Sequence, residues 1–340
     1  MEKILSICIP TYNMEALLSR CLDSFILEKE YLNKLEIIVV NDGSKDGSSE
    51  IAHQYSNKYP HSYIVIDKQN GNYGSCINAA LKVASGKYFK ICDADDKYET
   101  SNLKEYIDFL EKMNTDIVFS PFSTLMIDGT LNEKIECPES MVDKVLYIDD
   151  INWMENGMMD FRKMHSMSTK TSLLTNNRYF QTEGISYTDT QFSFYSLLYS
   201  KTCSFYGKNI YLYYLGRDGQ TMSISSMKKT HFHFYQNADR MMDSYREISY
   251  LFSEPRHSVL FDCILTESLL FVDVFLGSFL YVEKQIIAIK SLIDKAKGSY
   301  NPCPLEENLI RLSLRYRLWK KYHIPAFVIY ILVNIRNFFK

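Results

Sequence analysis

The first 120 residues alternate short apolar runs with stretches whose apolar residues recur at helical spacing. The apolar runs are nearly continuous in Ile, Val and Leu, which is typical of strands buried on both faces. We expect Asn13 to cap the first helix and Gly86 to end the third in a left-handed conformation. The predicted strands are 4–9, 35–40, 63–66, 88–92 and 116–120, and the predicted helices are 14–25, 48–58, 73–84 and, after a cap at Thr100 or Ser101, a helix up to 113.

Strands separated by helices of this length predict an α/β fold with a doubly wound, mostly parallel sheet. In such sheets ligands bind beyond the carboxyl ends of the strands. Polar clusters follow three of the predicted strands, at 11–13, 41–47 and 93–96. The sequence therefore predicts a ligand site where these clusters meet.

The remainder of the chain has a different pattern. A hairpin is predicted around Asp128-Gly129, then mixed helix and strand to 225, and two or three amphipathic helices over 228–298, the most apolar at 265–293. We expect a domain at 1–225, made of a nucleotide-sugar half (1–120) and an acceptor half (121–225), followed by a helical region at 226–340. The fold class is thus α/β with a C-terminal helical extension.

Composition and charge restrict the functional classes. With 46% hydrophobic and 23% charged residues, the 340-residue chain has ordinary globular composition. Its eight cysteines contain no C-x-x-C pair, which favours reduced, buried thiols and a cytoplasmic location. The last 33 residues hold seven lysines and arginines and no acid, so the preceding residues carry a net charge of −10. Nucleic-acid binding by the main body is therefore disfavoured.

The basic segment at 309–340 alternates cationic and apolar residues. Its most apolar part, 324–335, is too short to span a bilayer. One interpretation is an interfacial helix on the inner face of the cell membrane, with its cations toward anionic lipid. The other is a helix packed on the protein or on a second copy of it.

The run Asp93-Ala94-Asp95-Asp96 places three carboxylates within four residues, directly after a predicted strand. Such groups repel one another unless a cation lies between them. Hard divalent cations take oxygen ligands and bridge carboxylates to phosphate oxygens. The run therefore predicts a Mn²⁺ or Mg²⁺ site that holds a diphosphate, with a solvated acidic turn as the alternative.

The other two clusters carry weaker signals. Asp42 follows a predicted strand, where its carboxylate can accept from a nucleobase N–H or a ribose hydroxyl, and nearby glycines permit close approach of a ligand. The segment 41–47 is not a calcium loop, because the twelfth position is His53. The segment 69–75 contains Gly-x-x-Gly but no dinucleotide fingerprint. Plain polar turns remain the alternative for both.

Taken together and in order, the clusters carry a family resemblance. The segments 4–13, 36–47 and 84–96 resemble the inverting family 2 glycosyltransferases of the GT-A fold, of the type that builds bacterial cell-surface and capsular polysaccharides. The resemblance continues at 187–192, which is similar to the family's E-D-x-x-F segment. Thr188 stands where the family has Glu, and Asp189 is retained. The stretch 213–223 is similar to the Tyr/Arg/Ser segment that follows.

The resemblance implies a role for each matching residue. Pro10, Tyr12 and Asp42 would hold the nucleoside, and Asn70, Gly74 and Asn78 would line the same pocket. Asp93 would contact the ribose or the metal-bound water, Asp95 would ligate the metal, and Asp96 is a second metal candidate because the run offers two registers. Asp189 would be the general base, with a helix-capping acid as the alternative.

Arg217 is a candidate for gripping the diphosphate, with a surface ion pair as the alternative. His165, among methionines, is a candidate for the acceptor site or a structural histidine. The implied activity is metal-dependent inverting transfer from a nucleotide sugar, with UDP favoured, to a glycan or lipid-linked acceptor. A nucleotidyltransferase of the same fold and a non-catalytic nucleotide-sugar-binding scaffold are the other hypotheses.

Overall fold

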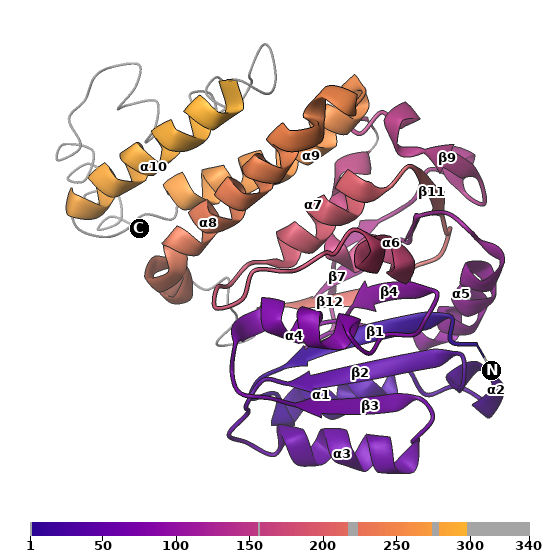
Figure 1. The fold of residues 1–340 in the computed structure, drawn as a ribbon. Coiled ribbons are helices and arrows are strands. Elements are labelled where there is room, and N and C mark those ends of the chain that lie inside the picture. Colours follow the sequence, from indigo (N-terminus) through magenta and orange to yellow (C-terminus); the bar gives the residue numbers. More distant parts are fainter. Residues whose placement is uncertain (1, 156, 217–223, 274–278, 298–340) are drawn as a thin grey trace. The chain divides into compact units, whose positions relative to one another are not determined.

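The computed structural model describes residues 2–155, 157–216, 224–273 and 279–297 (Figure 1). The chain divides into two compact units, Met1–Asp218 and Gly219–Lys340. The boundary at 225 expected from the sequence lies a few residues later. All three polar clusters belong to the first unit, which is α/β, and the described part of the second unit is helical.

An eight-stranded sheet forms the centre of the first unit. In spatial order its strands are β3 (Tyr63–Asp67), β2 (Leu35–Asn41), β1 (Leu5–Thr11), β4 (Tyr88–Ile91), β10 (Met167–Lys170), β6 (Ile117–Phe119), β11 (Thr202–Phe205) and β9 (Val145–Tyr147). The first four are parallel, whereas β10 runs antiparallel to β4 and β6, and β9 antiparallel to β11. Residues 35–40 are buried, as expected for a strand covered on both faces. The predicted doubly wound, mostly parallel sheet is confirmed.

Helices connect these strands and cover the sheet. They are α1 (Glu15–Asp23), α2 (Lys29–Leu32), α3 (Ser48–Lys58), α4 (Asn72–Leu81), α5 (Thr100–Lys112), α6 (Thr171–Asn176) and α7 (Asp189–Tyr199). Short 3₁₀ turns lie at η1 (Glu139–Met141), η2 (Ile148–Asp150), η3 (Met158–Arg162) and η4 (Met164–Ser166). Helix α4 packs on β1 and β2 (Figure 1). Helix α7 contacts η3 and η4. Both contacts matter for the site described below.

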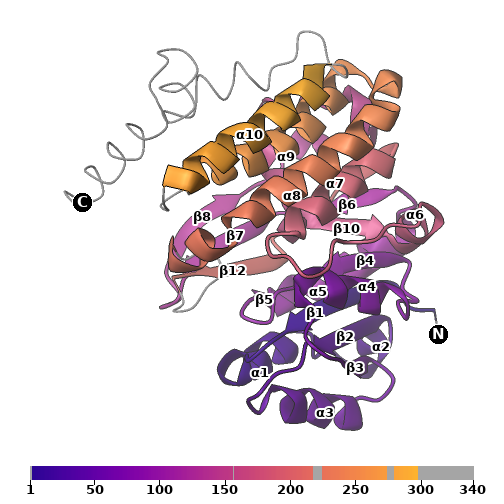
Figure 2. The ribbon, with the colours of Figure 1, turned by 60° about the vertical axis from the view of Figure 1, so that its left-hand side comes forward.

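A second, four-stranded sheet lies beside the first, and the sequence did not predict it (Figure 2). Its order is β5 (Lys97–Tyr98), β12 (Tyr211–Leu215), β7 (Phe122–Met126) and β8 (Leu131–Ile135). The predicted hairpin is confirmed: β7 and β8 pair antiparallel, and Gly129 takes φ +87° in the turn. Because β12 pairs with β5, it returns directly beside the acidic run that precedes β5.

Three predictions about the residues that begin or end helices are wrong. Asn13 does not cap α1: it takes φ +54°, and its side-chain oxygen accepts from the Lys45 N–H at 2.8 Å. Residue Glu99, rather than Thr100 or Ser101, occupies the cap position of α5. Gly86 is not left-handed; a Cβ there would lie 2.5 Å from the Ser6 backbone nitrogen, so close strand contact explains this glycine.

The second unit contains α8 (Ile224–Ile248), η5 (Ser249–Leu251), α9 (Glu254–Asp273) and α10 (Phe279–Lys297). Helix α8 is kinked at Thr230 and packs on both α9 and α10. The predicted amphipathic helices are therefore confirmed. Over 265–293, where the sequence predicts the most apolar helix, the structure describes α9 up to Asp273 and α10 from Phe279. Among the described residues, no helix is both long and apolar enough to cross a membrane. The basic segment 309–340 lies outside the described residues.

Candidate active site

The polar clusters meet at one edge of the large sheet. Strands β1, β2 and β4 are parallel, with Thr11 opposite Asn41 and Cys8 opposite Ile91. Their carboxyl ends therefore bring Tyr12, Asp42 and Asp93 to the same edge, as the sequence pattern predicts.

Asp42 follows β2 and is held by the loop that follows β3. Its side chain is buried, and one carboxylate oxygen accepts from the Lys68 ammonium at 2.6 Å and from the Gly71 N–H at 3.0 Å. The Asn70 side-chain amide donates to the Asp42 carbonyl at 3.0 Å. Gly43 takes φ +74°, and a Cβ there would lie 3.2 Å from the Asn70 nitrogen. The loop 68–71 thus holds the Asp42 carboxylate in a fixed orientation.

Tyr12 stands at the same edge with 47% of its surface exposed. The turn that carries it is tied to the Asp42 loop, because the Asn13 N–H donates to the Ser44 hydroxyl at 3.0 Å. Pro10 immediately precedes this turn on β1 and is half-buried. An exposed aromatic ring on a fixed turn is suited to stacking on a flat ligand.

The acidic run is held by tyrosines from distant parts of the chain. Asp93 is half-buried and accepts from the Tyr73 hydroxyl at 2.7 Å. Asp96 is fully buried and accepts from the Tyr211 hydroxyl at 2.6 Å and the Tyr214 N–H at 2.8 Å. Burial, followed by the charges of Asp93 and Asp95, raises the pKa of the Asp96 carboxyl well above its usual range. Asp93 and Asp96 therefore have fixed positions.

His165 joins this cluster from η4. Ligand atoms of Asp93, Asp96 and His165 all lie within 4.8 Å of one another. The Nδ1 atom of His165 is buried without a hydrogen-bond partner, and burial with the nearby charges of Lys90 and Lys163 lowers its pKa to about 3. The ring is therefore neutral and offers a lone pair. Two carboxylates and an imidazole suit Mn²⁺ or a similar divalent cation, so the residues present fit the predicted metal.

Asp95 lies outside this group of three. Its side chain is half-buried, and its backbone carbonyl accepts a hydrogen bond from Arg20. The Arg20 guanidinium stacks 4.0 Å from the centre of the Tyr214 ring. Direct metal ligation by Asp95 stays a prediction.

Asp189 opens α7 and faces the same region. Burial raises the pKa of its carboxyl, while the N–H groups of Asp189 and Thr190 and the charge of Arg162 act in the opposite direction. The preceding residue Thr188 accepts twice from the Gln181 side-chain amide, at 2.8 Å to its carbonyl and 2.8 Å to its hydroxyl. Tyr187 takes φ +64°, which costs a bulky residue roughly 1–2 kcal/mol. The fold therefore holds Asp189 firmly, with a raised pKa.

Tyr73 and Tyr213 lie near both Asp93 and Asp189. After burial, the charges of these two carboxylates raise the pKa of each tyrosine. The Tyr213 ring also stacks on His165, with ring centres 4.5 Å apart and planes 23° apart. Two aromatic side chains are thus positioned close to the metal candidate and to the base candidate at once.

Gly74 and Asn78 hold the segment that leads toward Asp189. The Asn78 side chain donates to the Gln181 carbonyl at 2.9 Å and accepts from the Gln181 N–H at 2.8 Å. A Cβ on Gly74 would lie 2.0 Å from the Thr182 carbonyl oxygen. The contacts of Gly74 and Asn78 with a nucleotide stay a prediction, and Arg217 lies outside the described residues.

Sequence reasoning missed several of these residues. Tyr73 lies inside a noted Gly-x-x-Gly segment, and Lys90 is a charged residue inside an otherwise apolar strand, a signal that was available. Tyr213 stands in the stretch 213–223 noted for its family resemblance, whereas Tyr211 carried no such signal, because β12 reaches the acidic run only through the second sheet.

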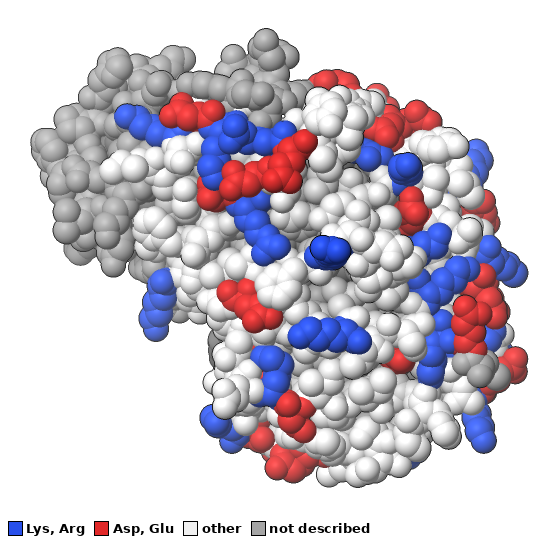
Figure 3. Space-filling view, viewed as in Figure 1, with Lys and Arg blue, Asp and Glu red and all other residues white. Residues whose placement is uncertain are grey.

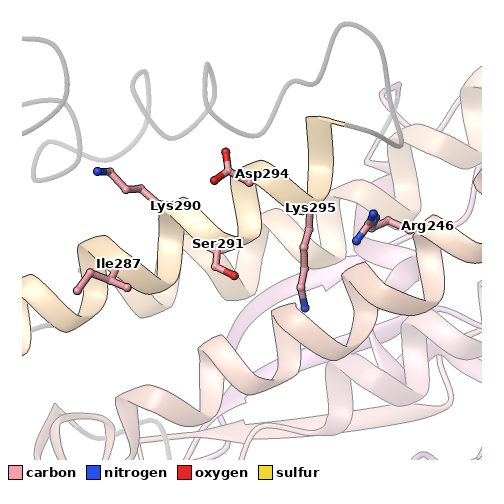
Figure 4. A pocket seen from close by; sticks show the side chains of 6 residues that line it. All are labelled: Arg246, Ile287, Lys290, Ser291, Asp294 and Lys295. Carbon is pink, nitrogen blue, oxygen red and sulfur yellow. The ribbon is translucent and has the colours of Figure 1, made fainter.

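A cavity of about 550 Å³ lies in the second unit, far from these residues in sequence (Figure 4). It is lined by Arg246, Ile287, Lys290, Ser291, Asp294 and Lys295. The Lys295 charge is already paired with Asp239 at 2.6 Å and Asp243 at 2.9 Å. On the face shown in Figure 3, basic and acidic side chains are interspersed. The candidate catalytic residues described above all belong to the first unit.

The architecture, with an acidic run after β4 of a mostly parallel sheet, is the GT-A fold, and solved structures support this. The S. aureus TarS 1–349 structure in complex with UDP-GlcNAc is 20% identical, with a TM-score of 0.64, covering 96% of this chain and 88% of that one. Mannosyltransferase PcManGT from Pyrobaculum calidifontis, in complex with GDP-Man and Mn²⁺, is 14% identical, with a TM-score of 0.52, covering 97% and 88%.

The profile of glycosyl transferase family 2 matches residues 6–180, and the chain belongs to this family of enzymes. The poly(ribitol-phosphate) beta-glucosyltransferase of Bacillus spizizenii is 30% identical over 232 residues, which is 67% of this chain and 35% of that protein. The minor teichoic acid biosynthesis protein GgaB of Bacillus subtilis is 30% identical over 128 residues, 38% of this chain and 14% of that protein. The chain thus spans about a third or less of the length of these two relatives.

Proposed function

We propose that this chain is a metal-dependent, inverting glycosyltransferase that moves a sugar from a UDP-sugar to a hydroxyl of a cell-surface glycan. One observation carries the proposal. Asp93, with its candidate metal partners, and Asp189, with its raised pKa, approach the same two tyrosines, Tyr73 and Tyr213. A candidate leaving-group site and a candidate base thus lie near the same two tyrosines, which supports this proposal.

The donor would lie along the sheet edge. Pro10, Tyr12 and the fixed Asp42 carboxylate would hold the nucleoside, and Asp93, Asp96 and His165 would hold Mn²⁺ or Mg²⁺, with Asp95 as a further candidate. When bound, such a cation stabilises the negative charge that develops on the departing diphosphate. Arg217 would bind the diphosphate through its guanidinium group.

Asp189 would take the proton from the acceptor hydroxyl as that oxygen attacks the anomeric carbon from the side opposite the diphosphate. Its raised pKa suits this role, since a carboxylate of higher pKa is a stronger base. Ordinary N-terminal helix placement would lower the pKa, so the burial of Asp189 is the property that favours catalysis over capping.

The comparisons support the choice of donor and acceptor. The TarS structure contains UDP-GlcNAc, the PcManGT structure contains Mn²⁺, and two relatives are named for poly(ribitol-phosphate) and teichoic acid chemistry. We therefore favour a UDP-sugar donor, Mn²⁺, and a polyol-phosphate or lipid-linked glycan acceptor. Contact of 309–340 with the inner face of the membrane would bring a cytoplasmic enzyme to such an acceptor.

Calorimetric titration with UDP, GDP, dTDP and CMP, with and without Mn²⁺, tests the donor site. The proposal predicts selective, Mn²⁺-dependent UDP binding that Asp93→Asn abolishes. Asp108→Asn is the matched control, because Asp108 also accepts from a tyrosine hydroxyl, that of Tyr31 at 3.0 Å, but on α5. Binding of another nucleotide would change the donor class, and absence of Mn²⁺-dependent binding to all four would overturn the proposal.

A further inference from the structure

Lys90 is a buried cation on the central strand β4. Its side chain has no exposed surface. The ammonium donates to the backbone carbonyls of His165, at 2.7 Å, and Met167, at 3.1 Å. Within the described residues, no carboxylate forms an ion pair with it.

A buried ammonium without a counter-charge is unfavourable, and an apolar side chain of similar length would fill the same space at lower cost. Burial accordingly lowers the pKa of Lys90 to about 7. The charge and its donors must therefore serve the carbonyls that they contact, because the packing of β4 does not require them.

The two carbonyls flank the point where the chain leaves η4 and enters β10. Strand β10 pairs with β4 only at Thr169 opposite Phe89 and Lys170 opposite Tyr88. The ladder therefore stops before it reaches Lys90, and the ammonium supplies the connection between β4 and the backbone that leads to His165.

This connection positions the side chain of His165. Its ring stacks on Tyr213 at 4.5 Å and meets Tyr211 edge-on at 4.9 Å. Its ligand atom lies within 4.8 Å of those of Asp93 and Asp96. Those rings limit tilting of the imidazole. The Lys90 contact acts with the Ser120 N–H, which donates to the Ser166 carbonyl at 2.9 Å, to set how far His165 reaches toward the carboxylates.

We propose that Lys90 is a positioning residue of the transfer reaction: its ammonium fixes the His165 backbone so that the imidazole faces Asp93 and Asp96. This role rests on the proposed function, because the position of the imidazole matters for the reaction only if the chain binds a nucleotide-sugar donor with its metal. The dependence of the His165 ring position on Lys90 can be tested in the protein without a ligand.

The geometric test is NMR of the full chain labelled with ¹⁵N-histidine, with His165→Ala used to assign the His165 ring among the seven histidines. Lys90→Met keeps the length of the side chain and removes the charge and donors. The control is Lys87→Met, because the Lys87 ammonium also donates to two carbonyls, of Leu110 at 3.2 Å and Glu111 at 2.8 Å, away from His165. We expect the His165 ring signals to shift in Lys90→Met and to stay in place in Lys87→Met. Unchanged His165 signals in a folded Lys90→Met protein would overturn the inference.

The functional test is the affinity for UDP in the presence of Mn²⁺. Loss of a residue that orients a metal ligand typically weakens binding by about tenfold or more, and we expect that loss in Lys90→Met. Lys90→Arg, which keeps a charge and donors, should recover part of it. In a His165→Ala background, Lys90→Met should add little, because both changes remove the same contribution.

The outcomes separate the two proposals. If the wild-type chain does not bind UDP with Mn²⁺, the proposed function fails, while the NMR result still decides the geometry. If the wild type and Lys90→Met bind UDP equally well, the positioning role is refuted. It is also refuted if the losses of UDP affinity in Lys90→Met and His165→Ala are additive in the double variant. If Lys90→Met does not fold, the same comparison is made with Lys90→Arg, which must disturb the His165 ring and UDP binding together.

Discussion

The hydroxyl of Tyr73 donates a 2.7 Å hydrogen bond to a carboxylate oxygen of Asp93, twenty residues further along the chain. Tyr73 is on the first turn of α4, and Asp93 follows β4. The bond therefore joins the loop that approaches Asp42 to the acidic run. One tyrosine thus links the two parts of the proposed donor site.

This relationship gives a first prediction. Tyr73→Phe removes the hydrogen bond and leaves the ring, so the Asp93 carboxylate loses one restraint, and Mn²⁺-dependent UDP affinity should fall by about tenfold. Tyr55→Phe is the matched control, because the Tyr55 hydroxyl donates to Asp23 at 2.6 Å, outside the site. Calorimetry on both variants makes the comparison, and equal affinities would show that Tyr73 does not support the donor site.

A second prediction concerns stability and pH. Burial raises the pKa of Asp189 in the folded protein above its unfolded value, so the folded state binds the proton more tightly. Ionised Asp189 therefore destabilises the fold at neutral pH, and this cost disappears as the pH falls through the folded pKa toward the unfolded value. Asp189→Asn should raise the melting temperature by a few degrees at pH 7, and the gain should shrink in acid. A lower melting temperature for Asp189→Asn at pH 7 would contradict this assignment.

A third prediction follows from the close approach at Gly74. Gly74→Ala forces a Cβ against the Thr182 carbonyl, and overpacking of this kind costs about 2 kcal/mol. Gly184→Ala is the comparison: Gly184 takes φ +77° but faces open space, so only the left-handed backbone opposes alanine, at about 1 kcal/mol. Urea unfolding of both variants measures the difference. A smaller loss for Gly74→Ala than for Gly184→Ala would mean that the 181–183 segment moves aside easily.

The sequence predicted those elements whose pattern is local. Strand β2 and helix α3 lie where the apolar runs and polar turns placed them, since buried parallel strands read as continuous apolar runs. The candidate cluster at the strand ends followed from that topology alone. Gly86 was assigned wrongly because its reason is a contact with Ser6, which the local sequence does not contain.

The parts of the site that escaped prediction depend on contacts between distant segments. His165 reaches the acidic run through the antiparallel insertion of β10 between β4 and β6, an order that no local pattern reveals. Tyr211 reaches Asp96 across more than a hundred residues, through a sheet that the sequence did not predict. Side chains that complete a site from such segments become visible only once the fold is known.

The most direct test of the account separates donor binding from proton removal. Wild type and Asp189→Asn are compared for Mn²⁺-dependent UDP affinity and for UDP release from a panel of UDP-sugars with a poly(ribitol phosphate) acceptor. The account predicts similar affinities and a rate that falls by about 100-fold or more in Asp189→Asn, the contribution expected of a general base. If Asp189→Asn releases UDP at the wild-type rate, Asp189 is not the base and the proposed mechanism is wrong.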